Sequence, residues 1–217
     1  MTTLAFLSVR IAVLACLADV AVGLPLAHLL ARGRFRGRRA LEVVFMAPLV
    51  LPPTVTGFLL LVLFGRHGVL GAPLRLATGL SVPFTTGAAV LAAAVVAFPL
   101  FLRTARAAIE AVGDAHAANA RALGLGPWRT ALRVTLPLAS RGLWSGAALA
   151  FGRAMGEFGA TLMLAGDIPG ETRTLSLAVF DAAAAGDDRL AGTLSLLLLA
   201  ASLAILGLAA LLERRRW

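Results

Sequence analysis

A cation and an anion stand four residues apart in one of the most apolar stretches of the sequence. Arg153 and Glu157 occur in FGRAMGEFGATLMLAGDIPGETRT, residues 151–174. Positions i and i+4 share a helix face, and a lone charge at mid-bilayer costs roughly 2.5–3.5 kcal/mol. The spacing therefore predicts an ion pair that faces the interior of a helix bundle. Two interpretations stay open: a polar wall of a translocation path, or a salt bridge that fixes helix packing.

Glycines surround this predicted ion pair. Gly152, Gly156 and Gly159 fall on neighbouring helical faces. Small residues let membrane helices approach closely. We expect these three glycines to serve helix packing, either within the subunit or across a dimer axis.

A second group of residues interrupts the backbone at membrane depth. The stretch APLVLPPTVTG contains Pro48, Pro52 and Pro53, which remove backbone donors. Thr54 and Thr56 can satisfy the carbonyl groups that are freed. An interrupted membrane helix is a pointer to a substrate path, so Pro52, Pro53, Thr54 and Thr56 are candidates to line one. A plain kink that shapes the bundle is the alternative.

Catalytic and metal-binding patterns are missing from the sequence. His28, His67 and His116 are scattered, and Cys16 is the single cysteine, so we expect no metal site, no disulfide and no cofactor. The sequence has no nucleophile-elbow serine and no phosphate-binding loop of the form G-x-x-x-x-G-K-[ST]. We expect no catalytic residue here, and any ATP hydrolysis must belong to another subunit.

The composition predicts an integral membrane protein that consists of helices only. Hydrophobic residues make up 59% of the chain and charged residues 14%, against about a quarter charged in soluble domains. A spanning helix needs roughly 20 apolar residues. The sequence offers five candidate spans in a single domain, residues 1–217, at roughly 5–31, 41–64, 84–102, 142–165 and 190–212.

The arginines predict the orientation of the chain in the cytoplasmic membrane. The net charge is +9, which we interpret as a topology signal and not as a nucleic-acid footprint. Arginines concentrate in three places, residues 32–39, 103–141 and 214–216. The positive-inside rule then places the N-terminus outside and the C-terminus in the cytoplasm.

The largest segment on the predicted cytoplasmic side is residues 104–137. Its Ala-rich first half predicts a helix that ends near Gly124. Pro127 suits the first turn of a second helix, and Pro137 marks the return to the membrane. This hairpin is long for a connector. It is either an amphipathic hairpin on the lipid surface or a surface that docks a partner.

The same segment resembles a known signature. AANARALGLGPWRTALRVTLP is similar to the coupling-loop signature of type I ABC importer permeases, which has small residues, a glycine, a gap of nine, an aliphatic residue and Leu-Pro. The acidic residue that normally opens the signature is absent, since Ala117 or Ala118 stands there. The resemblance implies contact with an ATPase through Ala118, Ala120, Leu123, Gly124, Gly126, Pro127, Leu136 and Pro137.

Two further stretches narrow the resemblance. GEFGATLMLAGDIPGETRTLSLAVF and APLVLPPTVTGFLLLVLFGRHGVLG closely resemble the molybdate permease subunits of ABC importers, and the similarity runs essentially from end to end. Sulfate permeases share a GE-aromatic-G core, but they are usually longer. Tungstate is an alternative cargo to molybdate on this evidence.

The resemblance implies a working assembly. Two copies of the chain would form a pore in the lipid membrane. Two ABC ATPase subunits would each receive one coupling helix, and an external binding protein would deliver the oxyanion. The competing interpretations are a sulfate or thiosulfate permease, a secondary transporter driven by an ion gradient, a membrane enzyme and a docking scaffold.

Overall fold

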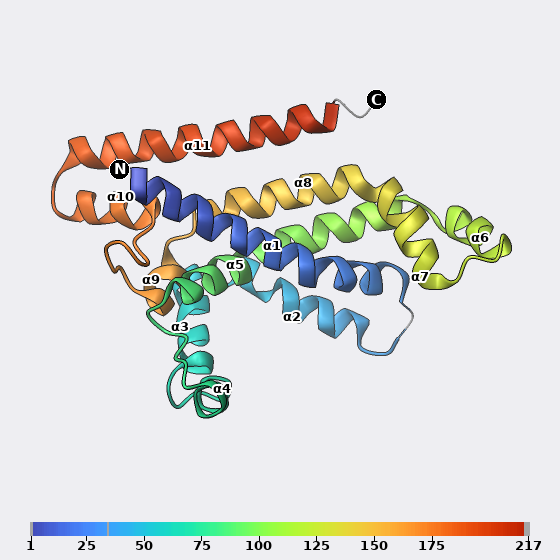
Figure 1. Ribbon diagram of the computed structural model, residues 1–217, viewed down its shortest axis with the longest axis horizontal. Helices are drawn as coiled ribbons and strands as arrows, with labels where there is room; N and C mark the ends of the chain where they lie inside the picture. Colours follow the sequence, from blue (N-terminus) through green and yellow to red (C-terminus); the bar gives the residue numbers. More distant parts are fainter. Residues whose placement is uncertain (1, 34, 215–217) are drawn as a thin grey trace.

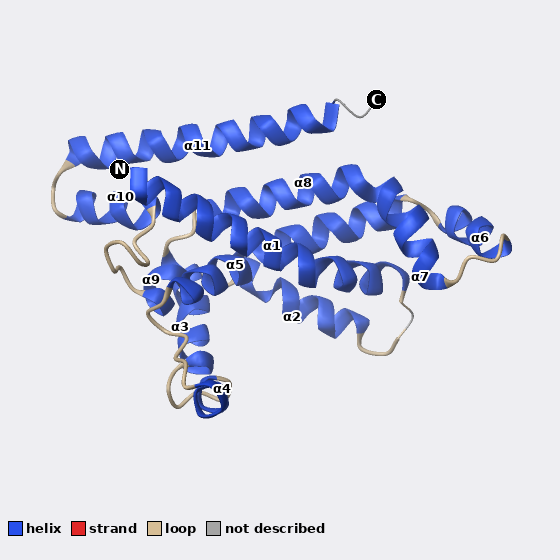
Figure 2. Ribbon diagram, in the orientation of Figure 1, coloured by secondary structure: helices blue, strands red, loops and turns tan. Residues whose placement is uncertain are grey.

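Helices build the part of the chain that the structure describes. This computed structural model describes residues 2–33 and 35–214, and every regular element within them is helical (Figures 1 and 2). The elements are α1 (Thr2–Arg32), α2 (Arg38–Val50), α3 (Pro53–Phe64), α4 (Gly71–Thr78), α5 (Thr86–Ala111), α6 (Asp114–Ala122), α7 (Pro127–Thr130), the π-helical turn η1 (Ala131–Thr135), α8 (Leu136–Met155), α9 (Gly159–Ala165), α10 (Leu175–Ala184) and α11 (Asp188–Arg214).

Three long helices, α1, α5 and α8, form the core of the bundle (Figure 1). The α5 face toward its neighbours consists mostly of buried alanines, among them Ala89, Ala92 and Ala97. Small residues also let α8 approach α5 closely, because a Cβ on Gly142 would lie 2.4 Å from the Cβ of Ala108. The core therefore depends on close backbone approach more than on large interlocking side chains.

The predicted span 41–64 is not one continuous helix. It divides into α2 and α3, which are bent by 118°. Leu51 has extended backbone angles (φ −71°, ψ 142°), and so does Pro52 (φ −53°, ψ 137°). A residue before proline is disfavoured in the helical region, and both Leu51 and Pro52 precede a proline. Two consecutive prolines thus turn α3 away from α2, and α4 lies at the outer tip of this arm (Figure 1).

The predicted span 142–165 is also two helices. α8 ends at Met155, and α9 begins at Gly159 after a short non-helical link. Gly156 is the C-terminal cap of α8 (φ −89°, ψ 8°), where glycine's low helix propensity favours an end. The side chain of Glu157 then accepts a hydrogen bond from the backbone N–H of Ala160, 2.8 Å away. This bond satisfies a donor in the first turn of α9.

The hairpin between α5 and α8 contains one irregular turn. Residues 127–155 run helically without a gap, and the π-helical turn η1 lies within them. Pro137, the predicted point of return to the membrane, lies in the first turn of α8, directly after η1. The ring of Pro137 would clash with the carbonyl of Arg133 in a regular α-helix. A wider turn at this place relieves that clash.

The membrane-spanning capacity of the helices is uneven. By length and composition α1, α5 and the described part of α11 can each cross a membrane, and α2 with α3 could form a fourth, bent span. α8, which carries Arg141 and Arg153, falls outside this set, so five spans remain a prediction. α11 lies along one edge of the bundle with very little of its surface buried (Figure 1).

Candidate functional site

The predicted ion pair is present at the break between α8 and α9. Arg153 Nη2 lies 2.8 Å from Glu157 Oε2. The side chain of Glu157 is 1% exposed, whereas that of Arg153 is 30% exposed. Glu157 therefore holds its charge in the interior through two contacts, the guanidinium and the N–H of Ala160. Arg153 keeps part of its guanidinium side chain toward the surface of the subunit.

The first turn of α3 packs directly on the first turn of α9. A Cβ on Gly159 would lie 3.1 Å from Thr54 Cγ2 and 3.2 Å from Pro53 Cβ. A Cβ on Gly57 would lie 2.6 Å from the Cα of Ala160. The two stretches that contain the predicted path residues, about a hundred positions apart in the sequence, are thus in contact through α3 and α9. The break between α2 and α3 and the break between α8 and α9 therefore both lie next to this crossing.

The four candidates on the first of these breaks have different surroundings. Pro52, Pro53 and Thr54 are exposed on the single subunit. Thr56 is buried, and its hydroxyl donates to the carbonyl of Pro52 at 3.4 Å. It satisfies a carbonyl at the break, as its sequence position suggested, and it faces away from the surface that the other three share.

The glycines differ in the packing that they permit. A Cβ on Gly152 would make only ordinary contact, 3.9 Å from Leu206 Cδ2, and a Cβ on Gly156 would lie 3.8 Å from the carbonyl of Gly152. Gly159 alone among the three predicted glycines lies at a close crossing of two helices. Sequence reasoning missed Gly57, although a single glycine among the large residues of α3 is a usable signal.

The loop between α9 and α10 is held by its own side chains. Arg173 makes a bidentate contact with Asp167 at 2.8 and 2.9 Å, and its Nη1 lies 3.2 Å from Asp181. The hydrogen bond to Asp167 raises the pKa of Arg173. The buried hydroxyl of Thr172 donates to the carbonyl of Gly166 and accepts from the N–H of Ile168. This fixed loop, residues 166–174, covers the end of the bundle next to α9.

The predicted coupling residues divide into two places. At the tip of the hairpin Leu123 is 82% exposed, and Gly124 has the left-handed angle (φ +85°) that ends the turn after α6. Ala118, Gly126 and Pro127 also lie near this tip, while Ala120 is buried beneath it. Leu136 and Pro137 lie at the other end of the hairpin, where α8 begins. An exposed apolar tip is thus carried by a helical arm.

Ion pairs connect the base of this arm to the bundle. Arg32, at the end of α1, pairs with Asp114 at the start of α6. Glu110 on α5 lies 3.2 Å from Arg38 Nη2 and 2.8 Å from Arg106 Nε. Asp114 and Glu110 are the acidic residues nearest to the one that the coupling signature lacks, and both are engaged inside the chain. Neither side chain replaces the missing carboxylate at the exposed tip.

The titratable side chains do not gather into a metal centre. Across residues 2–33 and 35–214, the structure holds no cluster of three or more His, Cys, Asp and Glu side chains that could bind a metal ion. The arrangement that the structure does provide is a partly buried ion pair beside two helix breaks, and a separate helical arm with an apolar tip.

The chain is similar to several transport proteins over most of its length. It is 45% identical to the molybdenum transport system permease protein ModB of Escherichia coli strain K12 over 174 residues, which are 80% of this chain and 76% of the relative. It is 41% identical to the putative molybdenum transport system permease protein YvgM of Bacillus subtilis strain 168 over 185 residues, 85% and 82% of the two chains. It is 41% identical to ModB of Mycobacterium bovis over 208 residues, which are 96% of this chain and 78% of the relative.

Solved structures share the fold. A chain of the inward-facing MetNI methionine ABC transporter matches with a TM-score of 0.75 at 19% identity, covering 97% of this chain and 93% of that one. A chain of a bacterial ABC transporter involved in alginate import matches with a TM-score of 0.76 at 16% identity, covering 99% and 79%. The predicted all-α ABC importer permease fold is therefore confirmed.

A family model also matches the chain as a membrane component of a transport system. Residues 21–217 match the model described as "Binding-protein-dependent transport system inner membrane component". The match includes both helix breaks and the whole hairpin. The chain therefore belongs to the family of binding-protein-dependent transport system inner membrane components.

Proposed function

We propose that this chain is the permease subunit of an ATP-driven importer that carries molybdate across the cytoplasmic membrane. The observation that carries the proposal is the similarity to permeases named for molybdenum transport, at 41–45% identity over 80–96% of the chain. Tungstate is chemically close to molybdate and is a second candidate cargo. The same similarity makes a sulfate or thiosulfate cargo less favoured.

The proposed working unit contains two copies of this chain, two ABC ATPase subunits and an external oxyanion-binding protein. The exposed hairpin tip at Leu123 and Gly124 would enter a groove of the ATPase, which would hydrolyse the ATP. The poorly buried α11 leaves surface for lipid or for the second copy. The N-terminus would lie outside and the C-terminus in the cytoplasm.

The proposed path for the anion passes the place where α3 meets α9. A dianion in a low-dielectric region needs positive potential and hydrogen-bond donors. Arg153 supplies a partly exposed guanidinium, and Thr54 supplies an exposed hydroxyl. The N-terminal end of α3, which begins at Pro53, adds the positive end of a helix dipole. Glu157 offsets the arginine, so that the anion is attracted but released.

Competitive uptake tests the proposed cargo. Cells without their own high-affinity molybdate and sulfate systems would express this chain with its ATPase and binding protein. We expect uptake of labelled molybdate that unlabelled tungstate suppresses and a large excess of sulfate does not. An ATPase subunit with its hydrolytic residue replaced is the control, and it should abolish uptake. Uptake that sulfate readily suppresses would contradict the molybdate assignment, and uptake that survives ATPase inactivation would contradict the importer class.

A further inference from the structure

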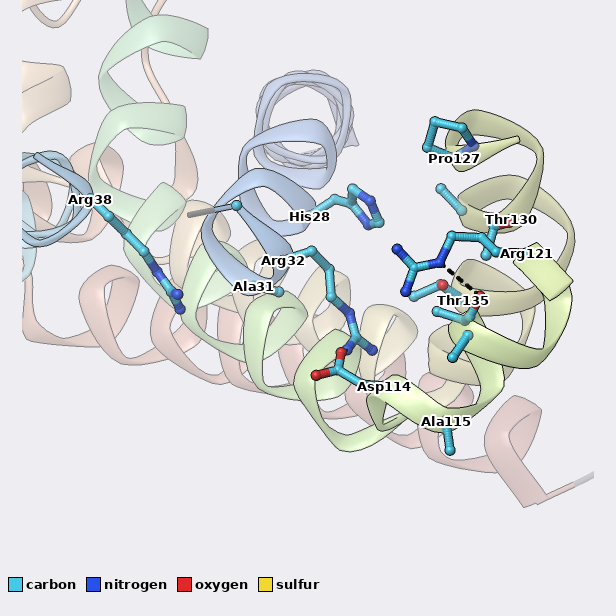
Figure 3. A pocket seen from close by; sticks show the side chains of 14 residues that line it. His28, Ala31, Arg32, Arg38, Asp114, Ala115, Arg121, Pro127, Thr130 and Thr135 are labelled. Atoms are coloured by element: carbon cyan, nitrogen blue, oxygen red, sulfur yellow. Dashed lines mark hydrogen bonds and ion pairs between the residues drawn. The ribbon is translucent and has the colours of Figure 1, made fainter. Parts of the chain in front are cut away.

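A cavity of about 900 Å³ lies between the end of α1 and the hairpin formed by α6, α7 and η1 (Figure 3). It is separate from the α3–α9 crossing, and Leu123 does not line it, but Ala118 and Pro127 of the predicted coupling residues do. Its polar lining comes from four parts of the chain and includes His28, Arg32, Arg38, Asp114, Arg121 and Thr135.

The lining of this cavity carries more positive than negative charge. Three arginines, one histidine and the carboxylate of Asp114 line it. Arg32 pairs with Asp114, and Arg38 pairs with Glu110 of α5. Arg121 has no carboxylate partner within the described part of the chain; its Nε donates to the carbonyl of Ala117 at 3.2 Å. Figure 3 shows Arg121 reaching into the space from the hairpin, and His28 entering it from α1. The two terminal nitrogens of Arg121 are thus placed to bind an anion.

Two buried nitrogen atoms around the cavity have no hydrogen-bond partner among the residues that the structure describes. They are Nδ1 of His28 and Nε of Arg32. Buried polar atoms are normally paired, and each exception calls for an explanation. Both atoms are shielded from solvent, so they lie behind the cavity wall, and a bound anion would contact other atoms of the lining.

The place of the cavity along α1 limits what can reach it. α1 has 31 residues, so at 1.5 Å per residue it is about 46 Å long. The hydrocarbon core of a bilayer is roughly 30 Å thick. His28 and Arg32 are in the last two turns of α1, so they stand in the headgroup layer when the helix crosses the membrane. Basic pockets at this depth are suited to the phosphates of anionic lipids.

We propose that this cavity binds a phosphate-bearing anion, held by Arg121 from the hairpin and by His28 on the facing wall from α1; Arg32 lines the cavity, but its terminal nitrogens are engaged by Asp114 and by the carbonyls of Ile109 and Gly113. Guanidinium groups bind phosphate oxygens in bidentate fashion. The bound anion would bridge α1 to the hairpin, which carries the proposed ATPase contact. The headgroup of an anionic phospholipid and free phosphate share this chemistry. The proposal is independent of which oxyanion the importer carries.

The test measures binding of defined anions to the full chain, purified in a neutral detergent. One arm titrates short-chain phosphatidylglycerol against short-chain phosphatidylcholine, and the other titrates inorganic phosphate. We expect selective binding of the anionic probe, and a loss of affinity of roughly tenfold in Arg121→Gln, because a charge-assisted hydrogen bond is removed. His28→Gln should weaken binding as well. Arg121 is exposed, so its replacement leaves the fold intact.

Arg129→Gln is the matched control, because Arg129 lies on the same hairpin but does not line the cavity. It should bind the probe as the unaltered chain does. Selective phosphatidylglycerol binding assigns the site to lipid, and equally tight binding of inorganic phosphate assigns it to the free anion. The proposal is overturned if neither probe binds, or if Arg129→Gln weakens binding as much as Arg121→Gln.

Discussion

At the scale of single residues, Glu157 is a carboxylate held in the interior by two contacts. Its carboxylate is nearly inaccessible, it pairs with Arg153, and it caps α9 through Ala160. Removing one partner of a buried ion pair costs about 3–5 kcal/mol, because the other charge stays uncompensated. The partial exposure of Arg153 reduces that cost here, since water can screen the site. The stability and the transport roles of the pair can therefore be separated.

Comparing Arg153→Gln with the double variant Arg153→Gln and Glu157→Gln separates the effect of the pair on stability from its effect on transport. Arg153→Gln leaves Glu157 buried without its cation, so we expect a melting temperature lower by roughly 2–8 °C and much slower molybdate uptake. In Arg153→Gln combined with Glu157→Gln, the amide oxygen can still cap Ala160. The melting temperature should then recover, while uptake should stay low because the positive charge is missing.

The measurements are thermal unfolding in detergent and uptake at matched expression. Recovery of both properties in the double variant would mean that the pair serves packing alone. Uptake that is unchanged in both variants would remove Arg153 from the proposed path altogether.

At the scale of elements, the crossing of α3 and α9 brings the two helix breaks together. The backbones touch where Gly57 meets Ala160, and a side chain larger than hydrogen has no room at that place. The crossing in turn sets the position of Pro53 and Thr54 against Gly159. The geometry of the proposed path thus depends on one glycine contact.

Gly57→Ala tests this dependence. Its Cβ would lie 2.6 Å from the Cα of Ala160, a backbone atom that cannot move aside alone. We expect destabilisation by about 1–3 kcal/mol, measured as a lower melting temperature in detergent. Gly192→Ala on α11 is the matched control, because its Cβ would meet nothing within 4 Å. That change should be neutral or stabilising by about 0.5–1 kcal/mol. Equal effects of the two substitutions would refute a special role for the crossing.

The hairpin is the second element whose role can be tested separately. Leu123 is mostly exposed, so Leu123→Glu should leave the stability of the permease unchanged while it abolishes co-purification of the ATPase. Leu76→Glu is a matched control, since Leu76 is 85% exposed on α4, away from the hairpin (Figure 1). It should retain the ATPase. Retention of the ATPase by Leu123→Glu would contradict docking through the tip.

Some of these elements could be predicted from the sequence, and others could not. The long apolar segments of the sequence overlap α1, α5 and α11, because hydropathy depends on composition, although α5 continues to Ala111, beyond the apolar segment 84–102. The bend at Pro52 and Pro53 was recognisable, since proline acts locally. The break at Gly156 was not, because it depends on Glu157 capping α9 from within the folded chain. The ion pair was predicted from spacing, whereas the packing of α3 on α9 next to it is a tertiary contact that no local pattern contains.

At the scale of the whole molecule, charge is distributed between two ends. Arg32, Arg38 and Arg121 lie at the end that carries the hairpin, and the loop with Asp167 lies at the end next to α9 and α10 (Figure 1). These three arginines, which belong to segments that the positive-inside rule assigns to the cytoplasm, thus gather at one end of the bundle. This arrangement supports the proposed orientation, which puts residues 166–174 outside.

Chemical labelling tests the orientation directly, because Cys16 is the only cysteine in the sequence. In a Cys16→Ser background, Glu171→Cys and Ala122→Cys each place one exposed thiol, at opposite ends of the molecule. A membrane-impermeant maleimide should label Glu171→Cys in intact cells, because its loop lies outside. It should label Ala122→Cys only after the membrane is opened, because the hairpin lies in the cytoplasm where it can reach an ATPase. The reverse pattern would invert the topology, and with it the proposed direction of transport.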